Sequence, residues 1–445
     1  MKKHKRSTFS GKLGFVLSAA GASVGLGNIW RFPYLAAKYG GGIFLLVYII
    51  LALTFGYTLI MAETSLGRMT RKSPVGAFES FGNSRFISIG GWINAIIPIL
   101  IVPYYSVIGG WVIKYLIEYF AGHSKTLAGD AYFTTFISNG WSTEICFIIF
   151  TLFTLGIIYA GVRNGIERVS KFMMPILIVL SLIIAVYSVT RPGAIEGVKY
   201  FLVPNFDHFS WMTVVSAMGQ MFYSLSIAMG ILITFGSYMK KDTSIEKSTE
   251  NVEIFDTAIA IMAGLMIIPA VFAFSGGNAE TLKSGPALMF ITIPKVFANM
   301  GFGTAIGVVF FLLVLFAALT ESAVSTFEDE LHWSRKKSTV FMGMVMLLLG
   351  TLSCLGYGPL ANFKILGMQF LDFFDFITNS VMMPIAAIAT CLLVSKVVGV
   401  DKIEEDGQAF RRKKIFCFMI KYLCPLFAAI ILISSVANAF GIITM

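Results

Sequence analysis

Residues 17–34 read LSAAGASVGLGNIWRFPY, an apolar stretch with three glycines in its middle and a proline near its end. Glycine lowers helix propensity by about 1 kcal/mol and proline by about 3 kcal/mol, so we expect a helix here to be interrupted. A second apolar stretch, GQMFYSLSIAMGILITFGSY at 219–238, holds Ser224, Ser226 and Gly230 near its middle. Interrupted apolar helices at corresponding places in two halves of a chain indicate the binding site of a secondary transporter.

The glycines also allow a second interpretation. Gly21 and Gly25 are spaced as GxxxG, which lets two membrane helices pack closely without any binding site. The stretch is not a dinucleotide-binding fingerprint, because its glycines run GxxxGxG and no parallel βαβ unit surrounds them. An opened helix would expose amides that attract a carboxylate, and carbonyls that suit a small cation. A zwitterion bound beside an alkali cation fits this arrangement.

The composition places both stretches in a membrane protein. Of the 445 residues, 57% are hydrophobic and 13% are charged, whereas a soluble domain carries roughly 25% charged residues. This argues against a soluble enzyme, a nucleic-acid binder and a disordered scaffold. The five cysteines form no CxxC pair and the four histidines no HxxxH pattern, so we predict neither a disulfide framework nor a zinc site.

Apolar stretches long enough to cross a hydrocarbon core of about 30 Å recur along the chain. We expect helices, because a membrane barrel would show short alternating segments instead. The predicted fold is an all-α integral membrane protein with eleven transmembrane helices. The expected spans are 13–37, 41–67, 87–121, 143–161, 166–190, 211–239, 251–275, 302–327, 338–357, 369–396 and 415–441.

The basic residues predict the orientation. Lys and Arg gather before the first span and in every second connection, which marks the cytoplasmic side. The RRKK run at 411–414 could bind lipid or nucleic acid, but a topological anchor explains it together with the others. The N-terminus is then cytoplasmic, without a signal-peptide cleavage site, and the C-terminus is extracellular. The expected divisions are a cytoplasmic tail 1–12, a first five-helix repeat 13–190, an extracellular loop 191–210, a second five-helix repeat 211–396, a cytoplasmic loop 397–414, and an eleventh helix with a short extracellular C-terminus 415–445.

The few charged residues inside the expected spans each need a partner. Arg31 follows the first break, and an arginine in an apolar span costs about 2.5–3.5 kcal/mol on insertion scales. A bound cation is one natural partner for a buried acid, and an internal salt bridge or a protonated carboxyl is the alternative. The acids within the spans are Glu63, Asp256, Glu321, Asp372 and Asp375.

Several motifs together carry a resemblance to a known family. They are GASVGLGNIWRFPY with the following GGG, VPYYSVIGGW, GIERVSKFMMP, GQMFYSLSIAMG, AGLMIIPAVFA, FAALT and DELHWSRKK. In this order, and over nearly the whole chain, they make it similar to the neurotransmitter:sodium symporter family, especially its bacterial amino-acid transporters. The resemblance implies a 5+5 inverted repeat with discontinuous helices 1 and 6. Broken helices in inverted repeats are known from this family itself, so the broken helices and the family resemblance are not two independent arguments.

The resemblance implies a substrate site between the two breaks. The amides of Leu26 and Gly27 and the Tyr105 hydroxyl would hold the substrate carboxylate, and Tyr223 would close over the pocket. The residues implied for substrate binding are Ser23, Gly25, Leu26, Gly27, Ile101, Tyr105, Tyr223, Ser224, Ser226 and Met229.

The resemblance also implies two sodium sites and two gates. In the first sodium site the substrate carboxylate itself would complete the ligands, which couples ion binding to substrate binding. The first site would use Ser23, Asn28, Ser224 and Asp256, and the second the carbonyls of Gly21, Val24 and Ala317 with Thr320 and Glu321. The external gate would be Arg31 with Asp375, and the internal gate Arg6 with Asp329.

Two positions predict the substrate and the anion dependence. Gly25 stands where amine transporters of the family have an aspartate, which favours an α-amino acid over a monoamine. Asp256 stands where chloride-dependent members have a neutral amide, beside Tyr48, Gln220 and Ser224. A fixed carboxylate would replace the chloride ion there, so we predict transport that does not need chloride.

Glu321 departs from the family pattern, which usually has serine after the threonine of FAALT. Three alternatives follow. Glu321 would bind sodium directly, or it would carry a proton and make the site proton-coupled, or the register shifts by one residue and Ser322 is the ligand.

The expected function is sodium-coupled symport of a hydrophobic or aromatic L-amino acid into the cell by alternating access, in the bacterial inner membrane. We expect Na⁺, an amino acid and the lipid bilayer as partners, with no organic cofactor, no nucleic acid and no enzymatic activity, in a monomer or weak oligomer. One alternative is a proton-coupled or exchange-type amino-acid transporter of the same fold. The other is a non-transporting membrane receptor that binds an amino acid.

Overall fold

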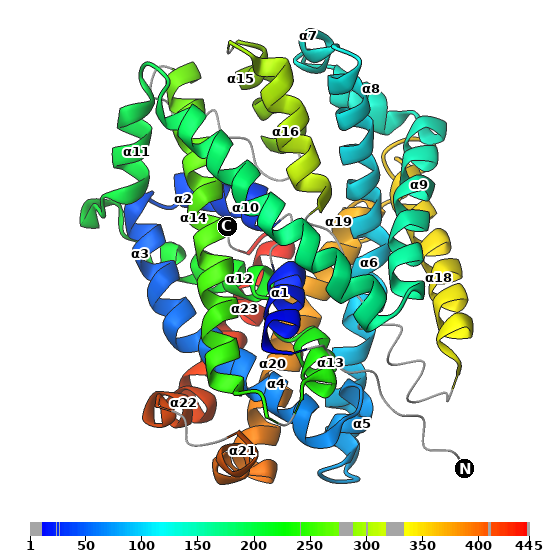
Figure 1. Cartoon of the computed structure of the whole chain (residues 1–445), viewed down its shortest axis with the longest axis vertical. Coiled ribbons are helices and arrows are strands. Elements are labelled where there is room, and N and C mark those ends of the chain that lie inside the picture. Colours follow the sequence, from blue (N-terminus) through cyan, green and yellow to red (C-terminus); the bar gives the residue numbers. More distant parts are fainter. Residues whose placement is uncertain are drawn as a thin grey trace.

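The computed structural model describes residues 11–23, 25, 27–240, 242–275, 288–299, 301–316, 333–407 and 411–442. The described residues form helices and turns, with only two isolated β-bridges between single residues. The helices stand mostly along one long axis (Figure 1). One end of the bundle, the α7 end, carries α7 (Ser124–Leu127), α8 (Tyr132–Ser138) and α15 (Ile293–Ala298). The opposite α21 end carries α5 (Pro74–Glu79), α21 (Val400–Gly407) and α22 (Lys413–Phe418).

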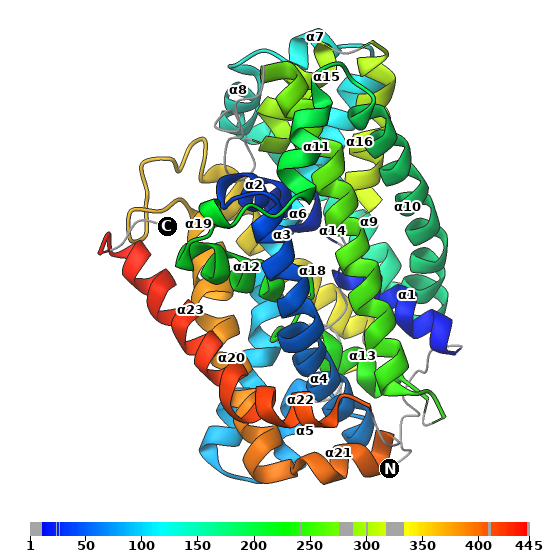
Figure 2. The ribbon, with the colours of Figure 1, turned by 90° about the vertical axis from the view of Figure 1, so that its left-hand side faces the viewer.

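Eight helices within the described residues are long and apolar enough to cross a membrane. They correspond to the predicted second, third, fourth, fifth, seventh, ninth, tenth and eleventh spans. They are α3 (Gly42–Leu51) continued by α4 (Tyr57–Thr70), α6 (Arg85–Phe120), α9 (Gly140–Tyr159), α10 (Arg168–Val189), α14 (Ile245–Ser275), α18 (Arg335–Leu355), α19 (Phe370–Asp375) continued by α20 (Met383–Leu392), and α22 continued by α23 (Cys424–Ala439). Figure 2 shows α23 on one side of the bundle and α10 on the opposite side.

The first predicted span is interrupted at its glycines. Helix α1 (Lys12–Ser23) ends just before Gly25, and the chain resumes as a π-helical segment, Gly27–Arg31, that leads into α2 (Phe32–Lys38). Pro33 lies in the first turn of α2, directly after the π-helical segment. The break is therefore where the glycines weaken the helix.

The sixth predicted span is interrupted as well. Helix α12 (Trp211–Ser224) starts at a capping box formed by Ser210 and Thr213, and it stops at Ser224. Helix α13 (Ile231–Tyr238) begins only after Gly230. Both broken helices lie about half-way between the two ends of the bundle (Figures 1 and 2).

Close packing fixes α13 against α4. A side chain on Gly67 would overlap the backbone carbonyl of Ile233, and one on Gly236 would overlap the backbone of Thr64. Small residues let membrane helices approach until their backbones touch, which gains van der Waals contact in a medium without a hydrophobic driving force. The second part of the second broken helix, α13, is thus held by α4. The eighth predicted span starts as α16 (Gly303–Phe316), and its remainder lies outside the described residues.

Candidate functional site

Asp256 on α14 lies where the two broken helices meet. Its side chain is fully buried. Asn28, on the resumed part of the first helix, donates from Nδ2 to Asp256 Oδ1 at 2.8 Å. Ser224, the last residue of α12, places Oγ 2.9 Å from both carboxylate oxygens. Tyr48 on α3 donates its hydroxyl to Oδ2 at 3.0 Å. We call Asn28, Tyr48, Ser224 and Asp256 the Asp256 network.

The Asp256 network holds an anion without a basic partner. Among the residues that the structure describes, no Lys, Arg or His forms an ion pair with Asp256. Hydroxyl and amide donors orient the carboxylate, but they leave its negative charge uncompensated in an environment where unpaired charge is costly. A small cation bound beside the carboxylate and the freed helix ends would compensate it.

The two breaks are also tied directly to each other. Ser23 donates its hydroxyl to the Leu225 carbonyl at 3.3 Å, and Gln220 donates its amide to the Gly27 carbonyl at 2.9 Å. A side chain on Gly27 would overlap the ring of Tyr223. Position 27 therefore needs glycine, and Tyr223 covers the backbone of the first break.

The backbone of the second break is held in an unusual conformation. Ser226 and Ala228 have φ values of 51° and 59°. The left-handed region is disfavoured for residues with a Cβ, so the surroundings must stabilise it. Glu63 on α4 does so: its Oε1 accepts the Ala228 N–H at 2.6 Å, and the side chain is fully buried. The sequence singled out Glu63 only as an acid in a span, and it did not predict this contact.

The residues expected to line a side-chain pocket are buried around these breaks. Ile101 is 8% exposed, Ser226 4% and Met229 5%. Tyr105 is half-buried and packs against the core beside them. Gly25 donates its amide to Asn28 Oδ1 at 3.4 Å, and no acid stands at that position.

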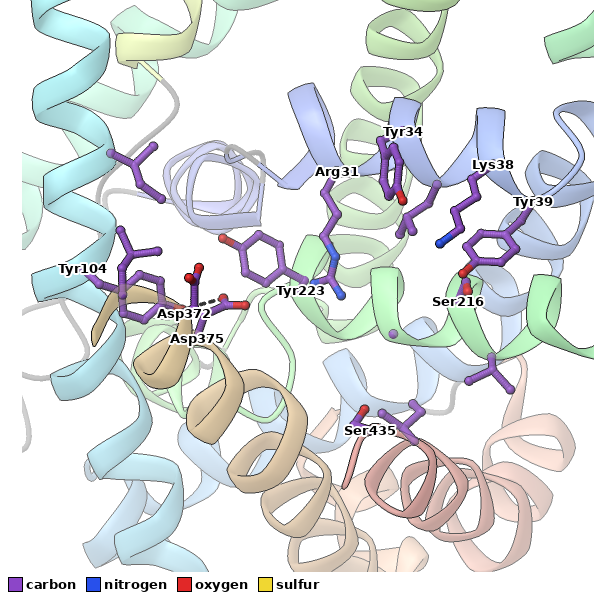
Figure 3. Close-up of a pocket in the computed structure, with 16 residues that line it drawn as sticks. Arg31, Tyr34, Lys38, Tyr39, Tyr104, Ser216, Tyr223, Asp372, Asp375 and Ser435 are labelled. Carbon is purple, nitrogen blue, oxygen red and sulfur yellow. Dashed lines mark hydrogen bonds between the residues drawn. The ribbon is translucent and has the colours of Figure 1, made fainter. Parts of the chain in front are cut away.

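A cavity of about 380 Å³ lies next to the breaks on the side of α2 and α19 (Figure 3). Arg31 and Lys38 contribute the positive charges of its lining, and Asp372 and Asp375 the negative ones. We call it the Arg31 cavity. The Arg31 guanidinium lies 5.2 Å from the ring centroid of Tyr223. In Figure 3 that ring lies between Arg31 and the two carboxylates.

The predicted gate residues Arg31 and Asp375 share this cavity, but these two described side chains form no ion pair. Asp375 Oδ1 instead accepts from Asn379 Nδ2 at 2.5 Å and from the Tyr104 hydroxyl at 3.2 Å. Tyr104 was not named from the sequence; the neighbouring Tyr105 was assigned to the substrate carboxylate, which is a different role. The only signal was the pair of tyrosines in VPYYSVIGGW.

Tyr357, in the turn before α19, fixes the second acid of the cavity. Its hydroxyl donates to Asp372 Oδ1 at 3.2 Å. This bond fixes one carboxylate oxygen of Asp372, a residue that lines the cavity.

Part of the predicted site lies outside the described residues. For the second sodium site the structure describes Gly21, which lies in α1 beside Ser170 of α10. The predicted residues outside the described ranges are Val24, Leu26, Ala317, Thr320, Glu321, Arg6 and Asp329.

A family model decides the assignment. The model of the sodium:neurotransmitter symporter family matches residues 6–147 and 133–442, which is nearly the whole chain. The chain belongs to the sodium:neurotransmitter symporter family. This confirms the resemblance, and because the family members and the structural neighbour are transporters, it also confirms a transporter rather than an enzyme.

Individual members of this symporter family match nearly the whole of this chain. The chain is 33% identical to the uncharacterized sodium-dependent transporter YhdH of Bacillus subtilis, over 100% of both proteins. It is 26% identical to the sodium- and chloride-dependent GABA transporter ine of Drosophila melanogaster, over 96% of this chain and 51% of that one. The crystal structure of MhsT in complex with L-phenylalanine matches with a TM-score of 0.87 and 33% identity, over 97% of this chain and 100% of that one.

Proposed function

We propose that this symporter carries a hydrophobic or aromatic L-amino acid together with sodium, and that one sodium ion binds at the Asp256 network. The observation that supports it is the buried Asp256 carboxylate, oriented by Asn28, Tyr48 and Ser224 at the meeting point of two broken helices. Sodium prefers oxygen ligands, and Ser23, Asn28, Ser224 and Asp256 supply them here. The substrate carboxylate would complete this site and so couple the two binding events.

The substrate class is inferred from the lining of the breaks. Gly25 offers no acid to pair a bare ammonium, which favours an α-amino acid whose own carboxylate meets the amides of Leu26 and Gly27. Ile101, Met229 and Tyr223 offer apolar and aromatic surface to its side chain. The similar protein MhsT was crystallised with L-phenylalanine, which is a substrate of the proposed class.

Chloride independence is part of the proposal. A fixed carboxylate already lies against Tyr48 and Ser224, so a chloride ion there would meet like charge in a buried site. The second sodium site, with Gly21, Val24, Ala317, Thr320 and Glu321, remains an expectation from the family pattern.

We also infer the placement in the membrane. The chain would cross the membrane eleven times. Its first ten spans would form two five-helix halves, at 13–190 and 211–396, and each half would begin with a broken helix. The predicted cytoplasmic segments hold basic residues, among them Arg68, Lys240 and Lys413, and α22, which begins at Lys413, lies at the α21 end (Figure 1). This favours the cytoplasmic side of a bacterial plasma membrane for that end. The N-terminus is then inside and the C-terminus outside.

Uptake into proteoliposomes tests the proposal. Labelled L-phenylalanine and L-leucine are offered with a sodium gradient, with potassium in place of sodium, and with gluconate in place of chloride. We expect the labelled amino acids to accumulate only with a sodium gradient, and to the same extent with gluconate as with chloride. Accumulation driven by a proton gradient alone, binding without accumulation, or loss of uptake without chloride would each contradict a named part of the proposal.

A further inference from the structure

One residue of the RRKK run does more than mark topology. Arg412 reaches between α4 and α14 near the α21 end, and its side chain is 30% exposed. Its guanidinium donates to the Leu53 carbonyl at 3.3 Å and lies 4.8 Å from the ring centroid of Tyr57. Arg411, directly before it, has an exposed side chain and uses its backbone N–H to bond Glu246.

Arg412 meets a row of acids on α14. Glu246, Glu250, Glu253 and Asp256 follow each other at intervals of four, three and three residues, which places them along one side of the helix. The first two lie toward the α21 end, and Glu250 is 33% exposed, with Oε1 4.0 Å from an Arg412 nitrogen. The row thus leads from the end of the bundle to the Asp256 network.

Glu253 is the unusual member of this row. Its side chain is 3% exposed, and neither carboxylate oxygen has a hydrogen-bond partner among the described residues. The nearest opposite charge is Arg412, with Nη1 3.7 Å from Oε2. Burying an ionised carboxylate without a counter-charge is costly, so Arg412 is what allows Glu253 to be charged in this position.

Glu253 also lies close to Asp256. Three residues of α-helix rise about 4.5 Å, so the two carboxylates stand one turn apart. A unit charge about 7 Å away, at an effective dielectric constant of about 20, changes the affinity of a cation site by more than ten-fold. Arg412 offsets the charge of Glu253 and therefore changes the electrostatic potential at a cation bound beside Asp256.

We propose that Arg412 is a positioning residue for the cation at Asp256: by offsetting the charge of Glu253 it keeps that site weak enough to release sodium. The inference rests on the proposed function, because it takes the cation to be the coupling sodium ion. Arg412 then has two roles, as a countercharge for Glu253 and as the residue that fixes the start of α22 against Tyr57 of α4 and the acids of α14.

Four variants test this assignment: R412Q, the matched control R411Q, E253Q, and E253Q/R412Q. Sodium titrations of L-phenylalanine binding to purified protein give the half-saturating sodium concentration, and uptake into proteoliposomes gives the maximal rate. In R412Q, measured at alkaline pH so that Glu253 keeps its charge without Arg412, we expect sodium affinity to rise by about ten-fold and the maximal rate to fall by a similar factor, since release slows. In E253Q the affinity should fall several-fold, because Arg412 is left in excess. In the double variant both values should return to within about three-fold of wild type, and R411Q should stay within about two-fold.

The outcomes separate the two claims. Sodium-dependent wild-type binding with R412Q indistinguishable from R411Q would overturn this inference alone and leave Arg412 a topological anchor. A loss of rate in R412Q that E253Q does not repair would show a merely structural role. Should R412Q fail to fold, E253Q still decides, since unchanged sodium affinity there contradicts the proposal. Wild-type binding of L-phenylalanine that does not depend on sodium would overturn the proposed function itself. The wild-type titration alone shows this outcome, so the two failures can be told apart.

Discussion

The Asp256 network and the Arg31 cavity both hold a carboxylate among hydroxyl and amide donors, but they meet its charge in different ways. Asp256 is fully buried, and three residues from three helices orient it, with no basic partner among the residues that the structure describes. Asp375 faces a cavity that it shares with Arg31, yet the two do not pair. We propose the first arrangement as a fixed site that needs a cation. We propose the second as a set of opposite charges that closes over a ligand.

The largest expected effect breaks the fixed site. In D256N the charge that would hold the cation is removed while the size of the side chain is kept. Sodium-driven uptake should fall about 100-fold or more in chloride-free buffer, because the charge in contact with the ion is lost. Added chloride should restore part of it, since the neutral amide no longer repels an anion beside Tyr48 and Ser224. Uptake within a few-fold of wild type in D256N would remove Asp256 from the coupling site.

The next effect concerns how the second break keeps its shape. E63A removes the acceptor of the Ala228 N–H and leaves that buried donor without a partner, at a cost of about 1–3 kcal/mol. We expect a lower melting temperature in detergent and a KM for L-phenylalanine raised about ten-fold. E63Q keeps an acceptor oxygen at the same place and should stay much closer to wild type. Equal effects of the two variants would mean that the carboxylate does not hold the break.

A smaller and different effect is expected in the Arg31 cavity. R31Q should lower the maximal uptake rate by about ten-fold and change sodium-dependent binding at equilibrium by no more than about two-fold, because a closing residue acts on passage rather than on the fixed site. Parallel binding and uptake measurements check this split. A large loss of sodium affinity in R31Q would show that Arg31 acts on the sodium site as well, and that the Arg31 cavity and the Asp256 network do not have separate roles.

The smallest effect is expected at Lys38, which lines the same cavity. Its ammonium lies 5.8 Å and 5.2 Å from the ring centroids of Tyr34 and Tyr39, and it pairs with no acid among the described residues. An exposed cation–π contact is worth about 0.5–1 kcal/mol, so K38Q should keep uptake within about two-fold to three-fold. A strong loss in K38Q would show that the cavity uses its general positive charge rather than Arg31 in particular.

Sequence patterns were sufficient for the parts of the site that depend on local chemistry. Glycines and serines inside apolar stretches weaken a helix, and the structure breaks α1 before Gly25 and α12 after Ser224. The meeting of Asn28, Ser224 and Asp256 followed from the family pattern, and the structure brings the three together. Their predicted role as sodium ligands awaits the uptake and binding measurements.

Contacts that depend on the packing of distant helices were not foreseen. The positive φ of Ala228 and its bond to Glu63 join α4 to the second break, and nothing in the local sequence shows which acid faces which backbone amide. The bond from Tyr104 to Asp375 was not predicted, because adjacent residues of a helix point about 100° apart and only the neighbouring helix decides which one reaches Asp375. Arg412 belongs to the same class, since its partners come from α4, from the segment Ala52–Gly56 before it, and from α14.

Sodium titration of L-phenylalanine binding to the purified wild-type protein, at constant ionic strength and without chloride, tests the central claim most directly. We predict binding that is absent without sodium and saturates as sodium is added, because the ion and the substrate carboxylate complete one site at Asp256. Full binding without sodium, or binding that appears only with chloride, would contradict the claim.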